Sequence, residues 1–422
     1  MKHETTHLPP PLDLSGWRGV PKVLMVIGGI LSLIGLFVSP KGHFGQDFGY
    51  AWLTAFMFFL TLALGALFFA IVHHLTDAGW SVATRRFCEH IASLLFPWLA
   101  ILFVPVILLA KQIYPWMKMY PSVILHPESD RTLSAKLPLM TMPGFIVASA
   151  VLFGIWWLMT GRINYWSLRQ DVTGDALCTR KMRFHSGWGI LAFAGTVTVA
   201  PTLWMQSLQY QWSSTMYGLY MFATCGWIAL ATMYVITAVL QRQRVLSDVL
   251  HDSQFYFIGV LFFAFTLLEA YFEFAQYFVI WNGNVPDETF WYIIREHGSW
   301  WCVSMLLIFG HFFTPFILLL PASVKMNFKV MVPLCLWAWL MNYADLAFNI
   351  YPALYPDSYP SHWFWLQFGC FIFMTGFLAQ AFLKKFLSHP PYPQRDPRIL
   401  EAMGVVHEPE ELPDTLPNGG AR

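Results

Sequence analysis

The sequence is poor in charged residues, which make up 12% of its 422 positions, against roughly 25% in an ordinary soluble domain. Its net charge is only +1, so the charge balance gives no argument for nucleic-acid binding. Hydrophobic residues reach 57% and aromatic residues 18%. This composition excludes an ordinary soluble enzyme and predicts an integral membrane protein.

Clustered cysteines are also lacking. The chain has no CxxC pair, no CxxCH haem-attachment motif and no ferredoxin-like run. The six cysteines stand singly, at Cys88, Cys178, Cys225, Cys302, Cys335 and Cys370. We therefore expect no covalently bound haem, no iron–sulfur cluster and no metal site in this chain.

Ten long apolar runs are the main positive feature, and each is long enough to cross a hydrocarbon core of roughly 30 Å. They lie at about 22–38, 50–73, 88–110, 143–160, 184–206, 214–240, 254–281, 299–320, 329–350 and 363–386. Runs of this length suit only helices. We predict an all-α protein with a tail over 1–21, a ten-helix transmembrane domain over 22–386 and a second tail over 387–422.

Basic residues predict the orientation, because Lys and Arg are enriched on the cytoplasmic side of membrane proteins. Nineteen of the 25 basic residues fall in the tails and the even-numbered connections. The other six are Lys41, Lys111, Lys118, Arg131, Lys136 and Arg295. We expect both termini to be cytoplasmic, with long loops over 111–142 outside and 161–183 inside. The Pro- and acid-rich second tail is expected to be disordered or bound to a partner.

Four stretches of sequence occur in the same order in one protein family. They are HHLTDAGWSVATRRFCEH (73–90), LWMQSLQYQWSSTMYG (203–218), FAQYFVIWNGNVPDETFWY (274–292) and GHFFTPFILLLP (310–321). Together they resemble the F subunit of bacterial alternative complex III, a quinol-oxidising respiratory complex. The wider group is the NrfD/polysulfide-reductase type of membrane subunit.

This resemblance implies two four-helix bundles, formed by spans two to five and six to nine. It implies a location in the bacterial cytoplasmic membrane and a role in quinol oxidation and proton translocation, with menaquinone or ubiquinone in the complex. The implied partners are a multihaem cytochrome c, an iron–sulfur subunit and a sister NrfD-like membrane subunit. The sequence departs from the family in two places. Leu203 stands where the end of span five usually has aspartate, and Glu269 stands where span seven is usually aromatic.

Span seven carries two acids inside an otherwise apolar helix. Thr266, Glu269, Glu273 and Gln276 have the spacing of one helix face. Span nine has a similar stripe, formed by Asn342, Asp345 and Asn349, and span eight contributes His311. If the three helices share a bundle, these groups can form a proton relay, with Glu273 and Asp345 as the favoured pair. The alternative is that the acids are protonated, hydrogen-bonded structural groups.

A second polar group lies at the predicted cytoplasmic ends of spans two and three. It consists of His73, His74, Arg85, Arg86, Glu89 and His90. Histidines on facing helices can ligate a haem, but the resembling family carries none in this subunit. We favour a charge network in which the arginines pair with Glu89 and the histidines extend to the lipid headgroups. The functional alternative is that the same network serves as a proton entry point on the cytoplasmic side.

No single motif defines a quinone site. Such a site needs an apolar slot with one or two polar groups, and the segment Gln206–Thr215 offers them. The WNGNVPDETFWY segment (281–292) also offers such polar groups, but we favour a role for this segment in docking to a partner. Three functions stay open: a proton-conducting subunit of a quinol-oxidising complex, a purely structural subunit, and a stand-alone secondary transporter with coupling-ion sites at the buried acids.

Overall fold

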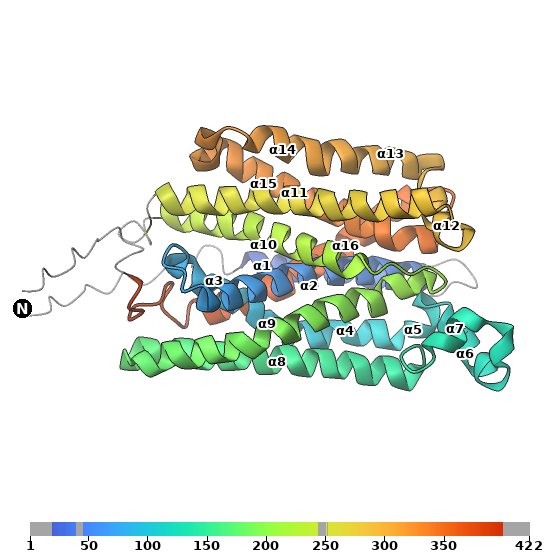
Figure 1. Ribbon diagram of the computed structural model, residues 1–422, viewed down its shortest axis with the longest axis horizontal. Helices are drawn as coiled ribbons and strands as arrows, with labels where there is room; N and C mark the ends of the chain where they lie inside the picture. The colour runs from blue at the N-terminus through green and yellow to red at the C-terminus, as the bar shows by residue number, and fades with distance from the viewer. Residues whose placement is uncertain (1–18, 39–44, 244–249, 251, 400–422) are drawn as a thin grey trace, which may run out of the picture.

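The computed structural model describes residues 19–38, 45–243, 250 and 252–399, and the regular structure in these ranges is entirely helical (Figure 1). Ten spans in this part of the chain are long and apolar enough to cross a membrane. They are α1 (Val20–Val38), α2 (Gln46–Leu75), α3 (Val82–Ala92) with α4 (Trp98–Leu108), α8 (Met142–Thr173), α9 (Ala176–Trp204), α10 (Tyr217–Arg242), α11 (Asp252–Gly283), α13 (Gly298–Leu306) with α14 (Thr314–Leu319), α15 (Phe328–Ile350) and α16 (Phe364–Phe386). The chain is therefore an all-α, multi-pass membrane protein, as its composition predicted.

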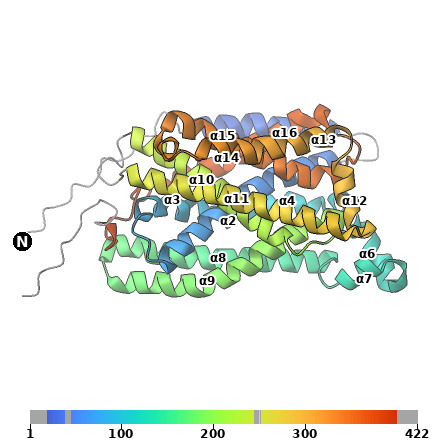
Figure 2. The same ribbon diagram turned by 45° about the horizontal axis from the view of Figure 1, so that its top comes forward.

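The spans form two four-helix bundles side by side (Figures 1 and 2). The first contains α2, the broken helix α3–α4, α8 and α9. The second contains α10, α11, the broken helix α13–α14 and α15. The bundles meet where α2 packs against α10, while α1 pairs with α16 beside them. The predicted grouping of spans two to five and six to nine is confirmed.

The contact between the bundles depends on Gly65 of α2. A Cβ atom added there would lie 1.8 Å from the carbonyl oxygen of Cys225 and 2.7 Å from the Cβ of Ala229, both in α10. Small residues at helix contacts let two backbones approach closely within a membrane. The two bundles therefore pack backbone against backbone at the centre of the molecule.

Two predicted loops are largely helical. The prediction of an inner loop over 161–183 is wrong, because α8 continues to Thr173 and α9 begins at Ala176. Gly174 turns the chain with a φ of +67°, and the Asp175 carboxylate accepts a hydrogen bond from the Leu177 amide at 2.8 Å. Apolar runs mark only the hydrocarbon layer, whereas helices extend beyond it. The predicted outer loop over 111–142 contains the short helices α6 (Trp116–Leu125) and α7 (Arg131–Lys136).

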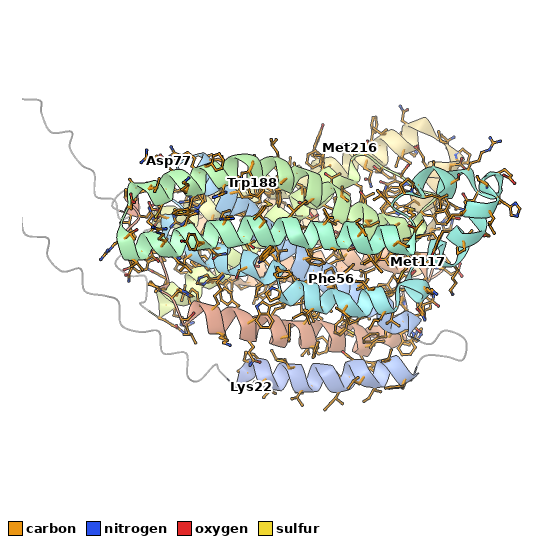
Figure 3. The ribbon with its side chains drawn as sticks, turned by 90° about the horizontal axis from the view of Figure 1, so that it is seen from below. Lys22, Phe56, Asp77, Met117, Trp188 and Met216 are labelled. Carbon is orange, nitrogen blue, oxygen red and sulfur yellow. The ribbon has the colours of Figure 1, made fainter. Side chains whose placement is uncertain are left out.

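The molecule has two distinct ends (Figure 3). We call the end that holds Lys22 and Asp77 the basic end, and the end that holds Met117 and Met216 the cap end. The cap end carries α6, α7 and α12 (Pro286–Arg295), as Figure 1 shows.

Part of the predicted C-terminal tail is folded. After α16, residues 388–399 pack onto the basic end, and Asp396 within them is buried. The expectation of a disordered or partner-bound tail is therefore wrong for these residues, because their charged groups find partners within the chain. Residues 400–422 of this tail and residues 1–18 of the N-terminal one lie outside the described residues.

Candidate functional site

The first polar cluster lies at the basic end of the first bundle and is buried except at Asp77 and Arg183. Its acidic and basic side chains alternate in one continuous series of ion pairs. The order is Asp171, Arg86, Glu89, Arg85, Asp396, Arg398, Asp77 and Arg183. Each member contributes one charge and the signs alternate, so the series is neutral overall. This balance matters because an unpaired charge buried in a protein costs several kcal/mol.

Glu89 is the centre of this cluster. Its Oε1 lies 3.0 Å from Nε of Arg85, and its Oε2 lies 3.5 Å from a terminal nitrogen of Arg86. The Ser167 hydroxyl of α8 donates a hydrogen bond to Oε2 at 2.6 Å. The spacing of 85, 86 and 89 places all three groups on neighbouring parts of one helix surface. The charge network expected from the sequence is thus formed, and it lies inside the protein.

The C-terminal segment closes the cluster through Asp396. This carboxylate accepts hydrogen bonds from Arg85 and from Arg398. Burial by itself raises the pKa of Asp396, but Arg85 and Arg398 outweigh burial and hold that pKa well below its usual range. The amide of Gln394 also donates to Asp171 at 3.1 Å. Residues 388–399 therefore cover the cluster and bind it by charge.

We expect Asp396→Asn to loosen this segment, because Arg85 and Arg398 then lose a charged partner. Amide hydrogen exchange over residues 388–399 should accelerate about tenfold or more, which corresponds to about 1.4 kcal/mol.

Since the pKa of Asp396 is lowered, the stability that its charge gives to the segment is present above the ordinary carboxyl pKa of about 4 and is lost as the pH falls through the lowered value. Wild-type protection, corrected for intrinsic exchange, should stay constant between about pH 5 and 8. Asp287→Asn, an exposed acid in α12, is the control; equal exchange in both variants would contradict the charge-bound segment.

The three histidines of this group are buried and do not extend to the headgroups, so that expectation is wrong. Nδ1 of His73 lies 2.6 Å from the Ser81 hydroxyl, and Nε2 of His74 lies 3.9 Å from Glu89. His90 packs against Phe386 and His389 instead of against His73 or His74 among the ring contacts of the described residues. This geometry does not support haem ligation by facing histidines. Both ring nitrogens of His74 and of His90 lack hydrogen-bond partners among the described residues.

The second buried cluster lies within the second bundle and centres on Glu269. Its Oε2 lies 3.1 Å from Nε2 of His311, and its Oε1 accepts a hydrogen bond from the Thr224 hydroxyl at 2.8 Å. Glu269 is 3% exposed and His311 is 6% exposed. The His311 ring also packs edge-on against Trp227. An acidic residue at the bilayer centre costs about 2.5 to 3.5 kcal/mol, and these contacts offset that cost.

The helix that carries His311 departs from α-helical geometry. Residues Leu307–Phe313 form a π-helical turn, η5, between α13 and α14. In this geometry the N–H of residue 315 would bond to the carbonyl of Gly310, but Pro315 has no N–H. The Trp337 indole N–H of α15 donates to that carbonyl at 2.8 Å instead. The distortion is thus held by a specific contact, and such π-turns are frequent at functional sites.

A second set of polar groups continues from this pair toward the cap end. The Tyr220 hydroxyl donates a hydrogen bond to the Asp345 carboxylate, which also accepts one from the Asn349 amide at 3.3 Å. Tyr217 donates to the Asn349 side-chain oxygen at 3.2 Å. Asp345 is 1% exposed and lies close enough to Glu273, His311 and Glu269 to interact with all three electrostatically. The polar groups therefore form a connected region.

Arg295 of α12 closes the cap end of this cluster. It donates to the carbonyl oxygens of Phe348 at 3.0 Å and Asn349 at 3.1 Å, and it stacks 3.4 Å from the ring centre of Trp291. These carbonyls belong to the last turn of α15, where the helix dipole favours a cation. Burial lowers the pKa of Arg295 to about 9. The cluster thus ends in a buried positive charge on the side of the cap helices.

The structure differs from the predicted relay in its details. Glu273 and Asp345, the favoured pair, lie close enough to interact electrostatically, but they are not hydrogen-bonded to each other, and Glu273 is only half-buried. Gln276 bonds to Ser214 and Tyr292. Asn342 is buried, with no hydrogen-bond partner among the described residues. Glu269 with His311 forms the direct contact.

Sequence reasoning missed the contribution of α10. Tyr217, Tyr220, Thr224 and Trp227 have the same one-face spacing that identified the stripe on span seven, so the signal was present. It also missed Asp171 and Asp396. No local pattern marks either acid, because each meets its arginine only in the folded chain.

The segment Gln206–Thr215, expected as a source of quinone-binding groups, lines a cavity of about 420 Å³ at the cap end. Leu139, Val199 and Leu203 supply apolar walls. The side-chain amide nitrogen of Gln206 and the indole nitrogen of Trp212 have no hydrogen-bond partner among the described residues. An apolar slot lined also by a few polar residues has the character that a quinone headgroup needs.

Comparison with protein-family models and with characterised proteins found no significant match. Fold and site together define the class: a multi-pass helical membrane protein built from two bundles, each holding a buried cluster of ionisable groups.

Proposed function

We propose that this protein is a proton-conducting membrane subunit of a quinol-oxidising respiratory complex, similar to the F subunit of alternative complex III. In this proposal it lies in a bacterial cytoplasmic membrane with both termini, and hence the basic end, in the cytoplasm. Its partners are a multihaem cytochrome c, an iron–sulfur subunit and a sister membrane subunit. The four sequence stretches, the two-bundle fold and the excess of basic residues at one end support it.

The observation that carries the proposal is the buried contact between Glu269 and His311. A carboxylate and an imidazole 3.1 Å apart can share and pass a proton. Tyr220, Asp345 and Asn349 then extend the polar region toward the cap end. The cluster around Glu89 is the corresponding proton-uptake region at the basic end. A quinone in this subunit stays a prediction, for which the cavity beside Gln206 is the site to examine.

Glu269→Gln tests this role in the assembled complex. We expect proton translocation per electron to fall to the value set by quinol oxidation alone, because the amide cannot ionise. Quinol oxidation itself should stay within about twofold, since Glu269 contacts no described group at the cavity beside Gln206. Glu288→Gln in α12 is the control and should keep wild-type translocation. Both activities are measured in vesicles with a pH-sensitive dye and an artificial electron acceptor.

The other functions give different results. Unchanged translocation in Glu269→Gln and in Asp345→Asn would favour a purely structural subunit. Purification of the chain without haem absorbance, followed by ion-coupled uptake of a solute in vesicles, would favour a secondary transporter.

A further inference from the structure

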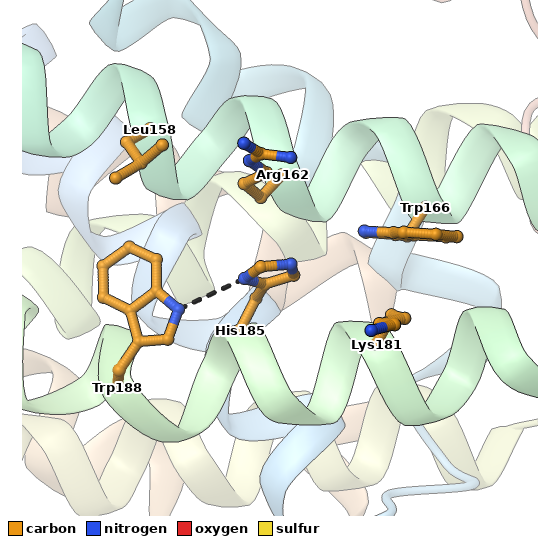
Figure 4. Close-up of a pocket in the computed structure, with 6 residues that line it drawn as sticks. All are labelled: Leu158, Arg162, Trp166, Lys181, His185 and Trp188. Atoms are coloured by element: carbon orange, nitrogen blue, oxygen red, sulfur yellow. Dashed lines mark hydrogen bonds between the residues drawn. The ribbon is translucent and has the colours of Figure 1, made fainter.

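A groove between α8 and α9 lies outside both buried clusters. It has a volume of about 420 Å³, and its walls are Leu158, Arg162, Trp166, Lys181, His185 and Trp188. Figure 4 shows Leu158, Arg162 and Trp166 on one helix facing Lys181, His185 and Trp188 on the other. Figure 3 shows Trp188 toward the same end as Asp77. The groove thus lies in the half of the two helices nearer the basic end.

The charge in this groove is positive and unbalanced. Arg162 and Lys181 are both exposed, and neither makes an ion pair with any residue that the structure describes. This sets them apart from Arg183, which pairs with Asp77 at 2.9 Å. Two exposed cations that form no ion pair within the described part of the chain favour an anionic ligand.

The polar geometry suits a phosphate group. The Trp188 indole N–H donates to Nδ1 of His185 at 3.2 Å, which leaves Nε2 of a neutral His185 as a hydrogen-bond donor. Arg162 supplies a planar donor set that matches phosphate oxygens, and Lys181 supplies a mobile ammonium group. Three donor side chains from two helices therefore line one groove.

The surroundings indicate that the anion is carried by a lipid. Leu158 is 43% exposed, Phe184 is 68% exposed and Leu191 is 76% exposed, so the helix surface beside the groove is apolar and open. Trp188 and Trp166 lie where this apolar surface meets the charged residues, as aromatic residues do at membrane interfaces. Acyl chains can follow the apolar surface while the headgroup occupies the groove. Basic grooves between transmembrane helices are a known form of lipid headgroup site.

We propose that this groove binds the phosphodiester headgroup of an anionic phospholipid, through Arg162, Lys181 and His185. The ligand bridges α8 and α9, two helices that otherwise expose much of their surface. Lipid binding of this kind is independent of the proposed role in quinol oxidation.

The test is native mass spectrometry of the full-length protein titrated with cardiolipin, phosphatidylglycerol and phosphatidylcholine. We expect the two anionic lipids to bind about tenfold or more tightly than phosphatidylcholine. The double variant Arg162→Gln with Lys181→Gln should lose that difference, while Arg180→Gln, a neighbouring exposed arginine outside the groove, should keep it. Arg162→Lys preserves the charge and should retain most of the affinity. Thermal unfolding of each variant without added lipid verifies that the fold is intact.

Three results would overturn the proposal. One is equal affinity for anionic and zwitterionic lipids. Another is an unchanged preference in the double variant. The third is displacement of the lipid by inorganic phosphate at comparable concentration, which would assign the groove to a soluble phosphate.

Discussion

Replacement of Gly65 by alanine is expected to destabilise the folded protein by about 3 kcal/mol, at the upper end of the usual cost of overpacking. The added Cβ atom would lie 1.8 Å from the carbonyl oxygen of Cys225, so α2 and α10 must separate to accept it. This contact is where the two bundles meet, and separation there weakens packing along both helices. Loss of stability is measured by equilibrium unfolding in mixed micelles, followed by tryptophan fluorescence.

Gly154→Ala is the matched control, because a Cβ atom added at Gly154 of α8 would meet no atom within 4 Å. Both substitutions have the same effect on helix propensity, so the difference between them reports the contact alone. We expect Gly154→Ala to be neutral or slightly stabilising. Equal stability of the two variants would show that α2 and α10 do not approach as closely as described.

Arg85→Ala is expected to cost about 3 to 5 kcal/mol, because it leaves two buried carboxylates without their shared cation. Glu89 and Asp396 both contact Arg85, and all three side chains are fully buried. Protonation of a carboxylate, or entry of water beside it, relieves part of this loss of stability, but it disrupts the close packing of α3 against α2 and α8. Unfolding in mixed micelles again provides the measurement, together with amide exchange over residues 388–399.

Arg183→Ala provides the comparison. Its side chain is 48% exposed and pairs with the half-exposed Asp77, and such surface pairs contribute at most about 1 kcal/mol. A double variant, Arg85→Met with Glu89→Gln, should recover part of the stability that Arg85→Ala loses, because it removes one acid along with the cation and leaves the series of ion pairs neutral. If Arg85→Ala and Arg183→Ala lose equal stability, the cluster at the basic end is not a buried network.

The candidate site could be predicted in part. Helical spacing placed Glu269 and Glu273 on one face of α11, and it placed Asp345 and Asn349 together on α15. Which of the two acids would meet His311 could not be predicted, because that depends on how far α11 is shifted along its axis relative to the helix that carries His311. Glu269 and Glu273 share a face but lie about 6 Å apart along the axis, so a shift of one turn exchanges one acid for the other. The π-turn at Leu307–Phe313 adds a further local rotation around His311 that no apolar pattern indicates.

In the cluster at the basic end, too, local spacing predicts contacts within one helix but not contacts between residues far apart in the sequence. Arg85, Arg86 and Glu89 could be grouped from their spacing alone, since they lie within one turn of α3. Asp396 lies 311 positions from Arg85, and nothing in its own neighbourhood distinguishes it from the other acids of the tail. Asp396 meets Arg85 only because α16 brings the chain back to the basic end.

The sequence by itself determined the ten spans, the all-α class and the presence of acids at membrane depth, because these follow from local composition and from the cost of exposing peptide groups to lipid. Only the tertiary structure decided which charges are neutralised, that residues 388–399 fold back, and that Glu269 meets His311. Ion pairs and hydrogen bonds require atoms within a few ångströms, and that proximity is set by helix rotation and packing between distant segments.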